Sequence, residues 1–172
     1  KRSMKNLDLA NKRKNAWGTG LIFNHAIDSI QNVTVAAGFT REISENANNT
    51  AYYRNAYGLG LAYNFVHTTY GLDLERQVTK NQGDKRTKNE VRAIVRQGLN
   101  EDWNVYAMYA YKTDKQFGDT DRTRQFMVGT EYYVYNQGSL KVKPFLEWQA
   151  TRTKYENSTV DRSRDFKTVI GL

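Results

Sequence analysis

Apolar and polar positions alternate with a period of two along most of the chain. In residues 57–65 the positions of Tyr57, Leu59, Leu61 and Phe65 are large and apolar, and the positions between them hold glycine, alanine or asparagine. Successive side chains of a β-strand point to opposite faces of the sheet. The pattern therefore predicts a strand with one apolar face and one small or polar face.

The same alternation recurs along the rest of the sequence, and residues 4–9 show a weaker version of it. Strands of roughly this length cross a membrane at a tilt. A succession of about ten such strands predicts a single all-β domain over residues 1–172, an antiparallel up-and-down transmembrane β-barrel. The further segments are residues 17–24, 33–40, 70–75, 91–96, 104–111, 126–134, 140–149 and 166–172.

The connections between these segments fall into two kinds that alternate along the chain. Outer-membrane barrels of Gram-negative bacteria have short periplasmic turns and longer external loops. The alternation therefore indicates such a barrel, and we give it more weight than any single residue. The short connections are residues 28–31, 66–68, 99–102 and 136–139, and the longer polar ones are residues 44–50, 80–87, 114–122 and 154–162.

Aromatic residues share the apolar positions and gather toward the ends of the predicted strands. Amphipathic rings are enriched where hydrocarbon meets the lipid headgroups, so the distribution favours an aromatic girdle. The alternative is cross-strand aromatic packing in a water-soluble sheet. The residues concerned are Tyr57, Tyr63, Phe65, Tyr70, Trp103, Tyr109, Tyr111, Tyr132 and Trp148.

Composition is compatible with this fold although the chain is polar, with a mean hydropathy of −0.79. The 12 Tyr, 7 Phe and 3 Trp argue against disorder. No apolar run of about 18 residues predicts a transmembrane helix, but a barrel strand needs only every second residue to be apolar. The sequence starts at Lys1 and ends on Leu172 rather than on an aromatic residue. We therefore expect a trimmed piece of a barrel of roughly 12–14 strands.

The polar positions of the predicted strands would line the lumen. They hold equal numbers of cations and anions, which we expect either to form facing basic and acidic walls of a hydrated pore or to pair into a ladder that fills it. The cations are Arg54, Arg92, Arg96, Lys112, Lys141, Lys143 and Lys167, and the anions are Glu42, Asp73, Glu75, Glu90, Glu131, Glu147 and Asp165.

The net charge of +8 comes from further basic residues near the predicted long loops. Three interpretations have equal weight: a mouth that concentrates anionic solutes, contacts with lipopolysaccharide phosphates, or solvation of the loops. These residues are Arg2, Lys12, Arg13, Lys14, Lys85, Arg86, Lys88, Arg122, Arg124, Arg152, Lys154, Arg162 and Arg164.

Catalysis, cofactor binding and metal binding have little support in the sequence. There is no cysteine, and the two histidines, His25 and His67, are far apart. His67 stands beside Thr68 and Thr69 but in a predicted periplasmic turn, which is a poor place for a hydrolase site. Nucleic-acid binding is also disfavoured, because the aromatic and basic residues fall mostly on opposite faces and cannot act together.

The chain resembles, in pattern, the small outer-membrane porins of the oligogalacturonate-specific family, which includes the sialic-acid-inducible channel. The similarity rests on residues 57–65, on residues 92–96 and on the segment from Lys143 to Trp148. It implies a monomeric barrel with a basic lumen that passes acidic oligosaccharides.

We accordingly expect an outer-membrane channel, not an enzyme, for passive diffusion of small hydrophilic and chiefly anionic solutes such as oligosaccharides. Its expected partners are outer-membrane lipid, lipopolysaccharide and these solutes. The alternatives are a closed barrel that acts as an adhesin or as a structural, lipopolysaccharide-contacting protein, and an outer-membrane hydrolase.

Overall fold

The computed structural model of the chain describes residues 2–5, 11–46, 51–81, 84–137, 140–156 and 162–171, and all regular structure in these ranges is β-strand. Ten of the strands form one antiparallel sheet, nine of them long and the first one short. They are β1 (Arg2–Lys5), β2 (Asn11–Ala26), β3 (Gln31–Asn46), β4 (Ala51–Phe65), β5 (Thr68–Asn81), β6 (Asp84–Gly98), β7 (Trp103–Gln116), β8 (Asp119–Tyr132), β11 (Phe145–Lys154) and β12 (Arg162–Gly171).

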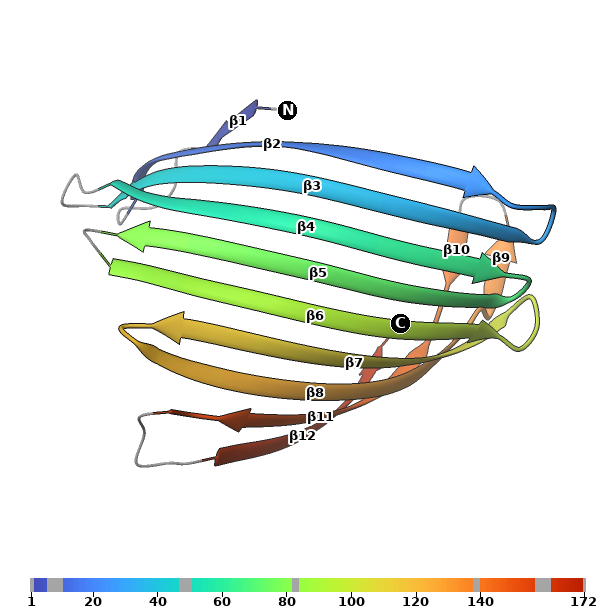
Figure 1. The fold of residues 1–172 in the computed structure, drawn as a ribbon. Helices are drawn as coiled ribbons and strands as arrows, with labels where there is room; N and C mark the ends of the chain where they lie inside the picture. Colours follow the sequence, from blue (N-terminus) through green and yellow to red (C-terminus); the bar gives the residue numbers. More distant parts are fainter. Residues whose placement is uncertain are drawn as a thin grey trace.

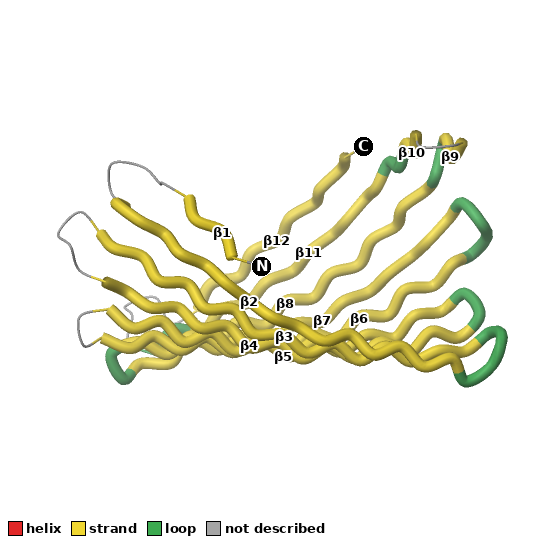
Figure 2. Tube along the Cα trace, turned by 90° about the horizontal axis from the view of Figure 1, so that it is seen from above, coloured by secondary structure: helices red, strands yellow, loops and turns green. Residues whose placement is uncertain are grey.

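The strands lie side by side in the order of the chain, so each long strand pairs with its neighbours in sequence (Figure 1). The exception is β11, which pairs with β8 because β9 (Tyr135–Gln137) and β10 (Leu140–Val142) form a separate two-stranded hairpin. Seen from above, the sheet curls into an open trough (Figure 2). The described sheet is not closed, and β1 and β12 are its two edges.

The predicted strand at residues 140–149 is wrong as one element. The structure divides it into β10 and β11, with Lys143 and Pro144 in irregular backbone between them. Proline has no N–H to donate to a strand ladder, so it interrupts the pairing there. The backbone N–H of Tyr132 instead donates to the Pro144 carbonyl at 3.1 Å, which ties the irregular segment to the end of β8.

The predicted alternation of short and long connections is also wrong. The strands β7 and β8 are joined by Phe117 and Gly118 alone, and β5 and β6 reach Asn81 and Asp84. Both Phe117 and Gly118 have positive φ, as a tight type I′ hairpin turn requires. The charged residues that suggested loops lie instead on extended strand ends, where polar side chains pair across the sheet. The predicted short turn at residues 136–139 falls within the β9–β10 hairpin, and residues 138–139 lie outside the described ranges.

Unbroken register keeps the two faces of the sheet distinct from β3 to β8. The apolar face carries Tyr57, Leu59, Leu61 and Phe65, which are 48%, 47%, 46% and 41% exposed, together with their cross-strand partners such as Leu72 and Val35. The opposite face, called the polar face below, carries the predicted lumen residues that belong to the strands of this sheet. Ala110 is the one buried hydrophobic residue among those described. The apolar side chains therefore do not pack into a core; they form an exposed sheet surface.

The sheet has two ends, which we name by the connections that lie there. The β2–β3 end holds the turns at residues 27–30, 66–67 and 99–102. The β3–β4 end holds the connection of residues 117–118 and those that join β3 to β4, β5 to β6 and β11 to β12. Among the described residues, no helix has the length and apolar character needed to cross a membrane.

Candidate functional site

The polar face carries a ladder of ion pairs that runs from strand to strand. Arg54 Nη2 lies 3.2 Å from Glu42 Oε2, and Lys112 Nζ lies 3.3 Å from Glu90 Oε2. Between these pairs, Arg92 Nε lies 3.3 Å from Asp73 Oδ2. In each pair the two residues stand directly opposite one another on adjacent strands. Register therefore brings every one of these cations to a carboxylate.

Glu131 is the most enclosed member of this ladder, with its side chain 6% exposed. One carboxylate oxygen accepts a hydrogen bond of 3.0 Å from Arg96 Nη1, and the other accepts one of 2.7 Å from Lys143 Nζ. A carboxylate removed from water needs such partners, because an unpaired buried charge is costly. Arg96 also lies over the Tyr106 ring, 5.7 Å from its centroid.

Tyr106 links three strands on the polar face. Its hydroxyl donates to Glu147 Oε2 at 3.0 Å, from β7 across β8 to β11. The ring passes over Gly129, where an added Cβ would collide with it, so this close approach requires glycine. The Arg96–Glu131 pair likewise skips one strand. Such contacts need side chains that converge, so they indicate that the curl of the sheet, which Figure 2 shows, is toward the polar face.

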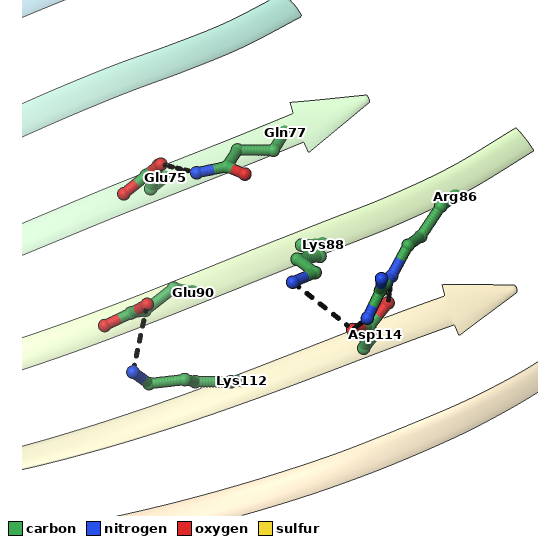
Figure 3. A network of polar contacts seen from close by, with 7 residues as sticks. All are labelled: Glu75, Gln77, Arg86, Lys88, Glu90, Lys112 and Asp114. Atoms are coloured by element: carbon green, nitrogen blue, oxygen red, sulfur yellow. Dashed lines mark hydrogen bonds and ion pairs between the residues drawn. The ribbon is translucent and has the colours of Figure 1, made fainter. Parts of the chain in front are cut away.

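A second network occupies the β3–β4 end of the polar face (Figure 3). Arg86 binds Asp114 with two hydrogen bonds, Nε to Oδ1 at 2.8 Å and Nη2 to Oδ2 at 2.5 Å, and Lys88 Nζ lies 3.7 Å from the same carboxylate. Asp114 follows the last apolar-face aromatic of β7, Tyr111, and lies beyond the apolar stretch of the strand. The hydrogen bond from Arg86 holds the pKa of Asp114 below its usual value, with smaller contributions from the charges of Arg86 and Lys88.

A groove of about 680 Å³ lies where the polar face is built from small residues. Its floor includes Gly38, Gly58 and Gly60, and its rim includes Asp73 and Arg92. A Cβ placed at Gly58 would meet no atom within 4 Å. The polar face is therefore divided into an open half over β2–β5 and a crowded half over β6–β11, where Tyr106 and the Glu131 cluster lie.

Most predicted lumen residues have a partner on the polar face, but their arrangement differs from facing charged walls. Opposite charges alternate locally and pair between neighbouring strands. Glu75 accepts a hydrogen bond of 2.5 Å from Gln77, whereas Lys167 is exposed on β12 near the edge of the sheet. The backbone of Lys141 lies in β10, and its side chain lies outside the described residues. The residues brought together are Glu42, Arg54, Asp73, Glu90, Arg92, Arg96, Lys112, Glu131, Lys143 and Glu147.

The sequence analysis missed the roles of Tyr106, Arg86, Lys88 and Asp114. Arg86 and Asp114 fall in segments predicted to be loops, and Lys88 follows directly after one of them. The alternation could have indicated the face of Arg86 and Lys88, because they continue the even-numbered series of Glu90 and Arg92 outward along β6. Tyr106 was assigned to the correct face, but no pattern within one strand indicates that its hydroxyl reaches β11.

Six of the basic residues expected near the long loops lie within β8, β11 and β12, on the apolar face near the β3–β4 end. Arg122 and Arg124 belong to β8, and the others to β11 and β12. His25 lies on the apolar face, its ring stacked 6.3 Å from that of Phe23, and His67 is exposed in the turn between β4 and β5. The six residues are Arg122, Arg124, Arg152, Lys154, Arg162 and Arg164.

Within the described residues, no three histidine, aspartate or glutamate side chains are grouped closely enough to hold a metal ion. The polar face offers charge pairs and a groove. A scan against protein-family models finds no matching family, and a search of curated proteins finds no similar sequence.

Proposed function

We propose that this chain forms the wall of a transmembrane β-barrel in the bacterial outer membrane, and that the barrel is a monomeric channel for small hydrophilic and chiefly anionic solutes. One observation carries the proposal: a continuous apolar sheet face is exposed while the polar, charge-paired face is enclosed by the curl of the sheet. Water penalises such an inside-out arrangement, because exposed apolar surface is unfavourable there. A lipid bilayer favours it.

The height of the apolar stretch supports this proposal. On β4 it runs from Tyr57 to Phe65, about 26 Å along the strand at about 3.3 Å per residue. A tilt of roughly 40° reduces this to about 20 Å, close to the apolar band of about 25 Å in outer-membrane barrels. Tyr70, Trp103 and Tyr132 lie at the β2–β3 end of the apolar face and are 49%, 43% and 47% exposed. This is the position of an interfacial girdle.

The groove over β2–β5 supports a path for solutes through such a barrel. Its small side chains leave width, and Asp73, Glu75 and Arg92 supply polar contacts along it. Selectivity in a channel of this kind comes from pore width, charge and hydrogen-bonding groups, without any chemical step. The cations at the β3–β4 end would raise the local concentration of anions at one mouth.

The ion-pair ladder favours a second candidate, a closed barrel that serves as an adhesin or a structural protein. The Glu131 cluster and Tyr106 fill the crowded half of the polar face, and a second such half facing them would leave no passage. In that case the exposed strand ends and connections would carry the function.

Single-channel recording in planar bilayers tests the proposal. Wild-type protein should conduct, with a preference for anions over cations. Gly58→Leu adds a side chain where the groove has free space, and it should lower the conductance to roughly one half. Ala93→Leu adds a side chain to the apolar face and is the matched control, with the wild-type conductance expected. If inserted wild-type protein did not conduct, the channel would be overturned in favour of the closed barrel. A preference for cations would overturn the anion channel.

A further inference from the structure

Six cations form two rows on the apolar face near the β3–β4 end, and we call them the basic rows. In the inner row, Arg152 stands directly opposite Arg124 on one side and Arg164 on the other. In the outer row, Lys154 stands opposite Arg122 and Arg162 in the same way. All six side chains are exposed. Three adjacent strands thus present six positive charges at neighbouring positions of one surface.

The basic rows are built without compensating acids. None of the six side chains makes an ion pair or hydrogen bond with another described residue. Like charges directly opposite one another destabilise a sheet. On the polar face, by contrast, Arg54, Arg92 and Lys112 each stand opposite a carboxylate on the neighbouring strand. The basic rows therefore require counter-ions from outside the described part of the chain.

A groove connects the inner row with the apolar surface. It has a volume of about 210 Å³ and is lined by the three arginines together with Tyr109, Phe126 and Phe166. One further step along the strands, Trp148 lies between Phe126 and Phe166, with ring centroids 6.4 Å and 6.1 Å away. Guanidinium groups and exposed aromatic rings thus adjoin on one surface, which suits an amphipathic anion.

We propose that the basic rows bind a lipid whose headgroup carries two phosphate groups, with its acyl chains along Phe126, Trp148 and Phe166. Arginine recognises phosphate with paired, charge-assisted hydrogen bonds. The two rows are two residues apart, or about 7 Å along the strands, so each row can contact a phosphate of its own. A free anion would use the arginines but not the aromatic surface beside them. The inference rests on the proposed function, since it needs the apolar face to lie in lipid.

The test uses the refolded protein in phosphatidylcholine vesicles that contain either diphosphoryl or monophosphoryl lipid A. Native mass spectrometry after detergent extraction measures the fraction of protein that retains each lipid. We expect the diphosphoryl form to be retained preferentially. Arg152→Gln/Arg164→Gln should lower its apparent affinity by about tenfold. The matched control, Arg76→Gln/Lys80→Gln, removes two cations from the same face and end on β5, and its affinity should stay within about twofold of wild type.

The outcomes separate this inference from the proposed function. Failure of the wild-type protein to insert, seen as full protease digestion with vesicles present, would overturn the channel and the lipid site together. Insertion with equal retention of both lipids, or equal loss in the two double variants, would overturn the lipid site alone. Complete displacement of the lipid by inorganic phosphate at about 10 mM would also overturn the lipid site, because this concentration competes for a simple anion site.

Discussion

The ion-pair ladder and the basic rows use the same residue types in opposite ways. On the polar face, Arg92 stands opposite Asp73 on the neighbouring strand. On the apolar face, Arg152 stands between two further arginines. Enclosure contributes to the difference where the ladder is deepest, because the side chain of Glu131 is 6% exposed and needs partners within the protein. The basic rows are exposed and can use an external counter-ion.

The two faces also differ in where their charges lie along the strands. From Asp73 to Glu131 the ladder extends through the middle of the sheet, and its charges there are level with the apolar residues of the other face. The apolar face carries no charged residue in the corresponding stretches of the described strands, such as residues 57–65, 91–95 and 103–111. Its charges begin only beyond them. Most charges on the polar face are therefore paired, whereas those on the apolar face are confined to the β3–β4 end.

The largest effect should come from a charge placed in the middle of the apolar face. We expect Leu59→Arg to destabilise the protein in vesicles by about 2–4 kcal/mol, because an arginine there must enter the hydrocarbon. Gly58→Arg is the matched control, since it puts the same side chain on the polar face directly opposite Glu75, with space around its Cβ. Its cost should stay below about 1 kcal/mol. Urea unfolding followed by tryptophan fluorescence measures both, and equal costs would contradict the lipid-facing assignment.

Removal of an enclosed anion should have the next largest effect. Glu131→Gln leaves Arg96 and Lys143 without their shared carboxylate, and we expect a loss of about 2–3 kcal/mol in the free energy of unfolding. This is less than for a fully buried pair, because the side chains of Arg96 and Lys143 are 46% and 38% exposed.

Glu75→Gln provides the control for this substitution. Glu75 stands opposite Glu90, so the loss of its charge also removes a repulsion, and we expect a change within about 0.5 kcal/mol. The same urea titration reports on both variants. If Glu131→Gln proved as neutral as Glu75→Gln, the ladder would be an incidental arrangement of solvated charges.

Period-two alternation predicted most of the strands and their faces, with residues 140–149 as the exception. The phase of residues 57–65 assigned Gly58 and Leu59 to opposite faces, and the structure confirms this. The same alternation continued through residues 84–87, but their high charge suggested a loop. Charge density is a poor guide to strand ends in this sheet, because polar side chains on neighbouring strands stabilise one another there, as Arg86 and Asp114 do.

The pairing of the lumen charges was not predictable from single strands. Alternation gives the face of each residue, but the partner depends on register, which the connections determine. The predicted long loops were wrong, so the register across them was undetermined. Lys143 reaches Glu131 only because the backbone breaks at Pro144 and the β9–β10 hairpin lies between the two residues in sequence. The basic rows were missed for the same reason, since Arg122, Lys154 and Arg162 were assigned to loops and the other three cations were placed near them.

The same substitution in the two regions should give changes of opposite sign. Arg92→Gln leaves Asp73 without its cation, and we expect a loss of up to about 1 kcal/mol. Arg152→Gln removes the central charge of a repulsive row, and we expect a gain of about 0.2–0.5 kcal/mol in pure phosphatidylcholine vesicles. Urea unfolding at low salt measures both. A loss on Arg152→Gln under these conditions would show that the basic rows have a compensating partner within the protein.

The smallest effect concerns the dependence of stability on pH at the β3–β4 end. Arg86 lowers the pKa of Asp114 from 3.8, so this group contributes stability that is present above about pH 4 and is lost as pH falls through the lower pKa of the folded state. Because the Asp114 side chain is 28% exposed, we expect its contribution to be about 0.5 kcal/mol. Asp114→Asn should therefore be less stable than wild type at pH 6, and the difference should shrink by pH 3. Glu101→Gln, in an exposed turn, is the control. A difference that grows as pH falls would contradict the pairing of Asp114 with Arg86.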